Sequence, residues 1–587
     1  MKIYRKLWGV LRPVDRKAAV VMCLLLFVGM LLETLGVGVV VPAVALMGTV
    51  DFAVTYPFLV PVLEYFGNPS REELVISGMV CLVVVYAVKS MFLAFLAWRQ
   101  ACFVFDLQES LSQQLFAGYL RQEYTFHLQR NSALLIRNVI GQVGDFAHVI
   151  QQGLLLATEL FVLFGISILL LSVEPLGALL VVFSVGAAGV GFHRSTRGRI
   201  VRWGEARQHH EGLRIQHLQQ GLGGAKDVIL LGREDEFLDQ YRKHNAGSAR
   251  IGRRHTTLQA LPRLILELMA VTGLAVLVLV MVLQGKSVET LLPTLGLFAA
   301  AAFRLMPSVN RVLAAVQSMR FSMPVVDTLS SELAILDDRK TPESGVVLPF
   351  CHQLTLSNIS FRYPSAKTAA LENVSISISK GSSVGLIGGS GAGKSTVVDV
   401  LLGLLTPTQG VVEVDGLDIR QNLRGWQDQI GYVPQSIFLT DDSLRRNVAF
   451  GLPDDQINDE AVWSALRAAQ LENFVRGLPE GLDTQVGERG VRLSGGQRQR
   501  IGIARALYHD PSVLVLDEAT SSLDTDTESG VMDAVRLLKG EKTLVIVAHR
   551  LSTVENCDYL YRFECGQIVA EGNVKNVLGP VGTVKSN

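Results

Sequence analysis

Long apolar segments in the first half of the chain constrain its fold more than any other feature. A helix needs about 20 apolar residues to cross the hydrocarbon core of a bilayer. The sequence predicts six such spans, of which the last is the shortest and weakest: residues 18–47, 74–98, 153–173, 176–192, 261–283 and 291–303. The first span lacks a small-residue cleavage site and leads into further spans, so we interpret it as a membrane helix and not as a cleaved signal. The first half is therefore predicted to be a multi-pass membrane domain.

The loops between these spans predict their orientation. Arginine is concentrated after the second and the fourth span, whereas the alternate loops contain only Arg71 and Lys286. By the positive-inside rule, the N-terminus, the long loops and the C-terminal domain are cytoplasmic. The long loops keep a helical periodicity, so the second to fifth spans are expected to continue as helices well beyond the bilayer. The net charge of the whole chain is zero, so no basic field indicates nucleic acid as a partner.

A glycine-rich loop in the second half has the spacing of a phosphate-binding P-loop. It follows an apolar run and precedes a helix-like segment, and its spacing fits G-x-x-x-x-G-K-[ST]. Backbone N–H groups and the helix N-terminus would bind the phosphates, the lysine would reach the β/γ-phosphates, and the serine would ligate Mg²⁺. The predicted ATP-binding residues of this loop are Gly388, Gly389, Ser390, Gly391, Ala392, Gly393, Lys394, Ser395 and Thr396.

Further polar residues complete the predicted hydrolytic site. The apolar run 513–516 is typical of a buried parallel strand, and it ends in Asp517 and Glu518, where an open α/β sheet presents its site. We expect Asp517 to hold Mg²⁺ and Glu518 to act on the attacking water. Gln435 is predicted to contact both Mg²⁺ and the γ-phosphate, and His549 to contact the γ-phosphate and the water. An aromatic ahead of the P-loop, Tyr363, is the candidate for stacking on adenine.

Residues 493–497, Leu-Ser-Gly-Gly-Gln, open another predicted helix. Together with the P-loop, Gln435, Asp517-Glu518, the 521–524 segment and His549, they resemble the ABC ATPase family over about residues 350–575. The resemblance implies an α/β P-loop ATPase domain that uses ATP and Mg²⁺ and dimerises head to tail. In that family ATP lies between the P-loop of one subunit and the segment of the other subunit that corresponds to residues 493–497, which we call the signature. The chain is therefore expected to form a homodimer. The residues that this implies for ATP binding are Ser494, Gly495, Gly496, Gln497 and Asp524.

The order of the domains resembles an ABC exporter half-transporter. We expect a transmembrane domain over 1–329, a linker over 330–349 and a nucleotide-binding domain over 350–587. Residues 486–490 resemble the exporter segment that senses the membrane domain, and 223–234 an intracellular coupling loop. The external segment 51–71 has apolar side chains on one helical face. It is predicted either to pack on the tops of the spans or to lie at the interface and contact an acyl chain.

Four cations in or near the spans are candidates for substrate binding: Lys89, Arg263, Arg304 and Arg311. Charge within a span costs about 2.5–3.5 kcal/mol, so it invites a functional hypothesis. One interpretation is a cationic belt that holds an anionic lipid head group. The other is snorkelling to the interface, or pairing with Glu33, Glu159 and Glu267.

Three short motifs resemble the PglK-type flippases, which move polyprenyl-diphosphate-linked oligosaccharides outward. They are Leu-Glu-Thr-Leu-Gly at 32–36 with Pro42, Leu-Pro-Arg at 261–263, and Phe-Arg-Leu-Met-Pro-Ser-Val-Asn-Arg at 303–311. The resemblance favours the belt and implies flipping of an anionic lipid-linked oligosaccharide across a bacterial inner membrane. Lys89 departs from the arginine expected there, and lysine lacks the bidentate fork for phosphate. The alternative function is export of a simple lipid or an amphipathic drug.

Other function classes are less consistent with the sequence. The six cysteines have no C-x-x-C or metal-ligand spacing, so buried or reduced thiols are expected. A soluble ABC ATPase of repair or translation would not need the six spans. An ATP-gated channel or receptor subunit would be identified by single-channel conductance.

Overall fold

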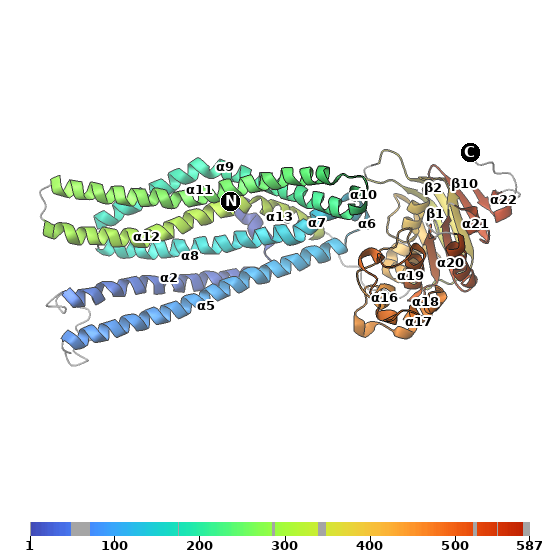
Figure 1. Cartoon of the computed structure of the whole chain (residues 1–587), viewed down its shortest axis with the longest axis horizontal. Coiled ribbons are helices and arrows are strands. Elements are labelled where there is room, and N and C mark those ends of the chain that lie inside the picture. Colours follow the sequence, from blue (N-terminus) through green and yellow to red (C-terminus); the bar gives the residue numbers. More distant parts are fainter. Residues whose placement is uncertain are drawn as a thin grey trace. The chain divides into compact units, whose positions relative to one another are not determined.

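The computed structural model describes residues 2–48, 71–173, 175–283, 288–337, 348–364, 366–519, 525–548 and 550–578. The chain divides into two compact units, which we describe separately. The first, the helical unit, comprises residues 1–122 and 127–339, and the second, the sheet unit, comprises 123–126 and 340–587 (Figure 1). The external segment predicted at 51–71 lies outside the described residues, apart from Arg71.

The helical unit consists of long helices joined by short connections. Its elements are α1 (Lys2–Val10), α2 (Pro13–Gly48), α5 (Arg71–Leu120), α7 (Ser132–Arg137), the π-helical turn η2 (Asn138–Gln142), α8 (Val143–Val173), α9 (Pro175–Gly223), α10 (Ala225–Leu230), α11 (Glu234–Leu283), α12 (Val288–Ser322) and α13 (Pro324–Asp337). The short helix α6 (Tyr124–Gln129) has residues in both units. Each of the six predicted spans lies within one of the helices α2, α5, α8, α9, α11 and α12. Among the described residues, three helical stretches are long and apolar enough to cross a membrane: Pro13–Gly36, Val75–Leu120 and Ser132–Ile168.

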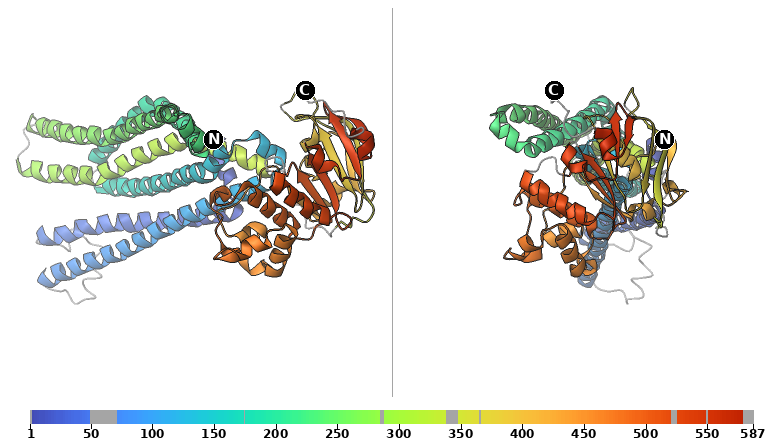
Figure 2. Two further views of the ribbon diagram at one scale, coloured as in Figure 1. Left: turned by 45° about the vertical axis from the view of Figure 1, so that its right-hand side comes forward. Right: turned by 90° about the vertical axis from the view of Figure 1, so that its right-hand side faces the viewer.

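The prediction that spans continue beyond the bilayer is confirmed. The helices α5 and α11 have 50 residues each, and α9 has 49. At 1.5 Å per residue such a helix is about 75 Å long, against a hydrocarbon core of about 30 Å. Within the unit α2 packs on α5 and α8, α9 packs on α11, and α12 packs on α8, α9 and α11 (Figures 1 and 2). The long extensions are therefore part of the same packed bundle as the spans.

The segment predicted as a linker begins inside a helix. Residues 330–337 continue α13, and Glu332 in it is buried. The carboxylate of Glu332 accepts a hydrogen bond of 2.9 Å from Tyr119 Oη on α5 and pairs at 2.6 Å with Arg130 Nη1. The polar residues that indicated a linker thus include Glu332, whose buried contacts attach α13 to the rest of the helical unit.

The sheet unit contains two sheets. A four-stranded antiparallel sheet has the order β2-β1-β4-β5, and a six-stranded sheet has the order β10-β9-β3-β8-β7-β6. The strands are β1 (Gln353–Phe361), β2 (Leu371–Ser379), β3 (Ser383–Gly388), β4 (Gln409–Val414), β5 (Leu417–Asp418), β6 (Ile430–Val433), β7 (Val513–Asp517), β8 (Thr543–Ala548), β9 (Tyr559–Glu564) and β10 (Gln567–Gly572). In the larger sheet β6, β7, β8, β3 and β9 are parallel, and β7 and β8 are wholly buried. Fully buried parallel strands explain the unbroken apolar runs of the sequence.

The strand register positions the predicted site. Ile387 pairs with Ala548, and Asp517 pairs with Val547. The carboxyl ends of β3, β7 and β8 therefore meet at one edge of the sheet, where α/β proteins bind their ligands. The P-loop and the Asp517-Glu518 pair both start from this edge.

In the sheet unit some helices pack against the six-stranded sheet, and others form a separate helical layer. They are α14 (Lys394–Leu401), α15 (Leu423–Gln427), α16 (Leu444–Val448), α17 (Asp459–Ala468), α18 (Glu472–Arg476), α19 (Gly495–Leu507), α20 (Thr525–Leu537), α21 (Leu551–Val554) and α22 (Val574–Leu578), with short 3-10 turns between some of them.

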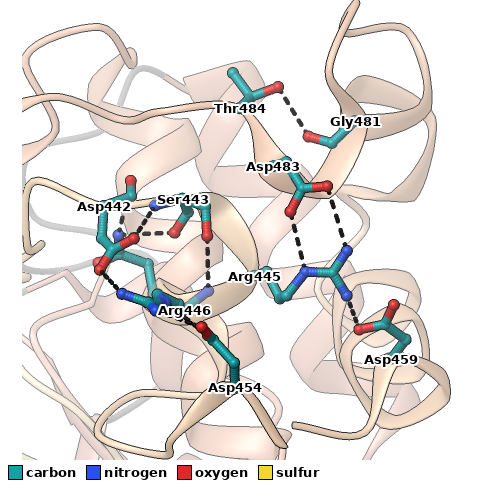
Figure 3. Close-up of polar contacts among 10 residues, drawn as sticks. Asp442, Ser443, Arg445, Arg446, Asp454, Asp459, Gly481, Asp483 and Thr484 are labelled. Atoms are coloured by element: carbon teal, nitrogen blue, oxygen red, sulfur yellow. Dashed lines mark hydrogen bonds and ion pairs between the residues drawn. The ribbon is translucent and has the colours of Figure 1, made fainter.

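Two neighbouring arginines attach α16 to the surrounding segments (Figure 3). Arg446 pairs with Asp442 at 3.0 Å and with Asp454 at 2.5 Å. Arg445 pairs with Asp483 at 3.1 Å and also with Asp459. A single exposed ion pair contributes little to stability, so we attribute the stabilising effect of these pairs to the network that connects the segments.

Candidate functional site

The P-loop has the backbone geometry that phosphate binding requires. Gly388 and Gly393 have φ angles of 154° and 103°, in the region that favours glycine. A Cβ on Gly388 would lie 2.4 Å from the carbonyl oxygen of Phe563, and one on Gly393 would lie 2.9 Å from that of Ala370. The helix α14 begins directly after Gly393 and has no side-chain cap. Its first N–H groups can therefore bind an anion.

Lys394 is held inside the loop. Its Nζ donates hydrogen bonds to the carbonyl oxygens of Gly388 at 2.9 Å and Gly389 at 3.0 Å, and the residue is 4% exposed. Burial lowers the pKa of Lys394, while Glu518 and Asp517 act in the opposite direction. A phosphate bound in the loop would offer the ammonium group oxygen acceptors in place of these carbonyl oxygens.

The two carboxylates follow β7 as predicted, and one of them is in an unusual conformation. Asp517 is the last residue of the strand and is buried. Glu518 has a φ angle of 51°, which is uncommon for a residue with a side chain. Its backbone N–H donates to the carbonyl of Val547, and its Oε2 accepts a hydrogen bond of 2.7 Å from Gln435 Nε2. Local strain of this kind occurs at functional sites, because the surrounding structure holds it.

The residues at this edge fit ATP with Mg²⁺. The loop presents N–H groups where side chains would clash, and a lysine already lies within it. The predicted ligands Ser395, Gln435 and Asp517 carry oxygen atoms, the kind of ligand that Mg²⁺ prefers. When bound, Mg²⁺ would neutralise charge on the phosphates.

Tyr363 lies beside the P-loop helix. Its Oη is 3.3 Å from Thr396 Oγ1, and its ring packs edge-on against Phe361 with centroids 4.9 Å apart. The half-buried ring is thus anchored at the start of α14, next to the predicted phosphate site.

Sequence reasoning missed two residues close to Asp517. Burial and the charge of Asp517 raise the pKa of Asp399 to about 6. Burial and the same carboxylate raise the pKa of Tyr432. Tyr432 lies on β6, which is adjacent to β7, and Asp399 lies on α14. The signal that could have found Asp399 is a carboxylate one turn into the P-loop helix.

The signature residues form an N-terminal cap. Ser494 Oγ accepts from the N–H of Gln497 at 3.2 Å, and Gln497 Oε1 accepts from the N–H of Ser494 at 2.8 Å. This reciprocal capping box starts α19, and its S-x-x-Q spacing was readable from the sequence. Ser494 and Gly495 are exposed, and Gly496 is buried. The predicted residues Asp524 and His549 lie outside the described residues.

Lys89 is buried and ion-paired within the helical unit. Its Nζ lies 2.5 Å from Glu33 Oε2, and the two side chains are 10% and 17% exposed. Gly36 provides the space, because a Cβ there would lie 3.1 Å from Lys89 Cδ. Thr34 of the same motif packs on Gly165 of α8. The Leu-Glu-Thr-Leu-Gly motif therefore joins α2 to both α5 and α8.

Arg311 is also paired with a carboxylate. Its Nε lies 2.5 Å from Glu159 Oε1 and its Nη2 lies 3.3 Å from Oε2, a two-pronged contact between α12 and α8. The Glu159 side chain is 8% exposed, whereas that of Arg311 is 50% exposed. Glu33, Glu159 and Arg311 line one cavity of about 180 Å³, which we call the charged cavity.

The other two cations are placed differently. Arg263 follows Pro262 within α11 and pairs with Glu267 one turn later at 2.8 Å, and both side chains are exposed. Arg304 lies on α12, but its side chain is outside the described residues. The structure therefore brings Arg311 into the charged cavity and Lys89 to its lining residue Glu33, and it does not bring Arg263 there.

A second cavity of about 430 Å³, the apolar cavity, lies between α8, α9 and α12. Its lining is apolar except for Ser167 and His193. Leu163 and Val312 line the apolar cavity, and the residues next to them, Val162 and Arg311, line the charged cavity. The two cavities thus open on different faces of the same turns of α8 and α12.

The segment predicted as a coupling loop forms a short helix. Residues 225–230 are α10, between the long helices α9 and α11. Apolar side chains on and beside it are exposed, namely those of Leu222, Ile229, Leu230 and Leu231. The 486–490 segment contains the turn Glu488–Gly490, in which Arg489 has a φ angle of 53°.

Comparisons with known proteins agree with this architecture. Residues 37–303 match the family model of the ABC transporter transmembrane region, and residues 371–521 match that of the ABC transporter. The chain is 30% identical over 480 residues to an ATP-dependent lipid A-core flippase of Cupriavidus metallidurans, covering 80% of each chain. It is 31% identical to the protein of that name from Alkalilimnicola ehrlichii, covering 82% of this chain and 79% of the other. A solved bacterial Atm1-family ABC exporter with ATP bound matches with a TM-score of 0.78 over 97% of this chain and 98% of that one, at 22% identity, a likeness of fold.

Proposed function

Because this chain belongs to the ABC transporter family, with the transmembrane region and the ATPase domain on one polypeptide, we propose that it flips an anionic lipid-linked oligosaccharide outward across a bacterial inner membrane. The family assignment makes it a multi-pass membrane protein that binds ATP with Mg²⁺ and hydrolyses ATP in a cytoplasmic domain. The finer assignment of the cargo rests on the helical unit.

One observation carries the cargo proposal: a charged and an apolar cavity adjoin the same turns of α8 and α12. A lipid with a polar head group needs both environments, and the apolar cavity, at about 430 Å³, has the size of a typical ligand site. The relatives are named ATP-dependent lipid A-core flippases, and this name supports a lipid cargo for this chain. An uncharged lipid or drug would not need the buried ions.

We propose that the anionic head group exchanges with the carboxylates. In the structure Glu33 and Glu159 hold Lys89 and Arg311, so each pair is neutral. A diphosphate offers the same acceptors as two carboxylates and binds arginine in two-pronged fashion. The diphosphate can displace Glu33 and Glu159 if these carboxylates accept hydrogen bonds from other donors or from water as the charged cavity opens. The proposal keeps Arg263, on α11, and Arg304, on α12, as further cations of the helical unit.

We further propose that the working unit is a homodimer with two composite ATP sites. Lys394, with the rest of the P-loop, and Tyr363 would hold the nucleotide in one chain, with Asp524 and the Ser494–Gln497 cap contributed by the other. Glu518, oriented by Gln435 and assisted by His549, would activate the attacking water. The N-terminus of α19 offers a further set of N–H groups for the γ-phosphate.

Complementation tests the shared site. Lys394→Ala and Ser494→Arg should each abolish ATP hydrolysis, and co-expressed chains should regain part of it. One site of a mixed dimer then carries both defects, and the other carries neither. Recovery in the mixture supports the composite site, whereas a mixture that stays inactive despite demonstrated mixed dimers contradicts it.

A transport assay tests the cargo. The chain is reconstituted in proteoliposomes, and ATP-dependent flipping is measured for a fluorescent polyprenyl-diphosphate oligosaccharide, its monophosphate, and a neutral glycolipid with the same tail. The proposal expects the diphosphate to be flipped fastest. Equal rates for the neutral glycolipid would instead support a general lipid or drug exporter. Glu518→Gln serves as the inactive control.

A further inference from the structure

Four histidine rings lie together on the extensions of α9 and α11. His209, His210 and His217 belong to α9, and His244 belongs to α11. The Nδ1 atoms of His210 and His244 are 3.1 Å apart. The ring centroid of His244 is 5.3 Å from those of both His210 and His217, and the ring of His209 lies 5.8 Å from that of His210 and 6.4 Å from that of His244. Neither the transport cycle nor the ATP site proposed above uses these residues.

The distance between the two nitrogens is close to that of two ligands on one metal. Zn²⁺ binds histidine nitrogen at about 2.0–2.1 Å in tetrahedral geometry, which places two ligand nitrogens about 3.3 Å apart. A separation of 3.1 Å needs to open by only a few tenths of an ångström. Rings that share such a metal have centroids about 5 Å apart, compared with 5.3 Å for His210 and His244.

The backbone makes room for this arrangement. A Cβ on Gly247 of α11 would lie 2.7 Å from both Cε1 and Nε2 of His210. Only a residue without a side chain allows the imidazole of His210 to reach across to α11 and meet His244. His217 stacks on the other side of His244, with 20° between the ring planes, and holds that ring in place.

We propose that His210 and His244 bind a divalent transition metal of the Zn²⁺ class and that His209 supplies a third nitrogen. Among the described residues no three ligating side chains are already set for a metal, so the exposed His209 must rotate toward the pair. Imidazole ligands suit zinc, copper and nickel, whereas Mg²⁺ and Ca²⁺ prefer oxygen. A metal here would tie the long helices α9 and α11 together.

The competing explanation of the short contact is an ordinary hydrogen bond, in which one Nδ1–H donates to the other Nδ1.

Zinc titration of the full-length chain distinguishes these explanations. The protein is purified with a tag that contains no histidine, stripped with a chelator, and titrated with Zn²⁺ against a fluorescent zinc indicator, without nucleotide. We expect one zinc per chain. His210→Ala and His244→Ala should each weaken binding by about a hundredfold or more, because loss of even an outer partner of a ligand costs about 10–100-fold.

Two further variants complete the experiment. Gly247→Ala removes no ligand but displaces the His210 ring, so it should also weaken zinc binding while the helix stays intact. His509→Ala, an exposed histidine of the sheet unit, should change nothing. The proposal is overturned if no saturable binding occurs, or if either His210→Ala or His244→Ala binds zinc as tightly as the wild type.

Discussion

Gln435 Nε2 donates a hydrogen bond of 2.7 Å to Glu518 Oε2, and this contact links the end of β6 to the carboxylate after β7. The Glu518 backbone is in a left-handed conformation with a φ angle of 51°. Two polar side chains from neighbouring strands are thus held together at the sheet edge that carries the P-loop. An oriented carboxylate of this kind can accept a proton from water.

Glu518→Gln should therefore leave ATP binding intact and reduce hydrolysis by a factor on the order of 10²–10⁴, the usual contribution of a general base. The amide is isosteric and can still hydrogen-bond Gln435. Nucleotide binding and phosphate release measured on one preparation check both parts. Glu541→Gln, an exposed carboxylate of the same unit, is the matched control. Wild-type hydrolysis in Glu518→Gln would exclude Glu518 as the base.

Asp399 should make the stability of the protein depend on pH. Its folded pKa of about 6 is higher than its ordinary value of 3.8, because burial and Asp517 disfavour its charge. The folded state therefore binds more protons than the unfolded state between these values, and the stabilisation present at low pH is lost as pH rises through about 6.

Asp399→Asn should consequently raise the thermal unfolding midpoint clearly more at pH 7.5 than at pH 4.5. The midpoints are measured without nucleotide and Mg²⁺, so that only the protein's own charges contribute. Asp428→Asn, a half-exposed surface carboxylate, controls for the loss of a charge. An equal shift at both pH values would mean that Asp399 acts through packing and not through its charge.

Thr34 and Gly165 test the packing of α2 on α8. A Cβ on Gly165 would lie only 2.1 Å from Thr34 Oγ1, so Gly165→Ala must push the helices apart or rotate the threonine. Overpacking of this kind costs about 1–3 kcal/mol. We expect a lower unfolding midpoint in detergent, and partial recovery when Thr34→Ala is added. Gly144→Ala on the same helix, where nothing lies within 4 Å, should have no such effect.

The sequence predicted the features that arise from local pattern. Apolar runs gave the six helices, and the P-loop and the residues after 513–516 were placed at one sheet edge. Those signals are short-range, because strand, glycine loop and helix follow one another along the chain. The capping box of Ser494 and Gln497 is local as well, because its two partners are three residues apart.

Contacts between distant segments could not be predicted. Glu33 and Lys89 lie on the separate helices α2 and α5, and Glu159 and Arg311 on the separate helices α8 and α12, so their pairing depends on how the bundle packs. The same is true of Asp399, whose pKa depends on a strand more than 100 residues away. The polar stretch after residue 329 indicated a linker, yet Glu332 finds Tyr119 and Arg130 and remains in a packed helix.

The central claim, that Lys89 and Arg311 serve an anionic head group and not only their carboxylates, is tested most directly by flipping of the diphosphate lipid in two pairs of variants. Lys89→Gln and Arg311→Gln are compared with Lys89→Gln/Glu33→Gln and Arg311→Gln/Glu159→Gln, in which no uncompensated buried charge remains. We predict that single and double variants all lose flipping by at least about tenfold, or about 1.4 kcal/mol, while their ATPase activity without substrate persists. Recovery of flipping in the double variants would show that the pairs are only structural and would contradict the proposed cargo site.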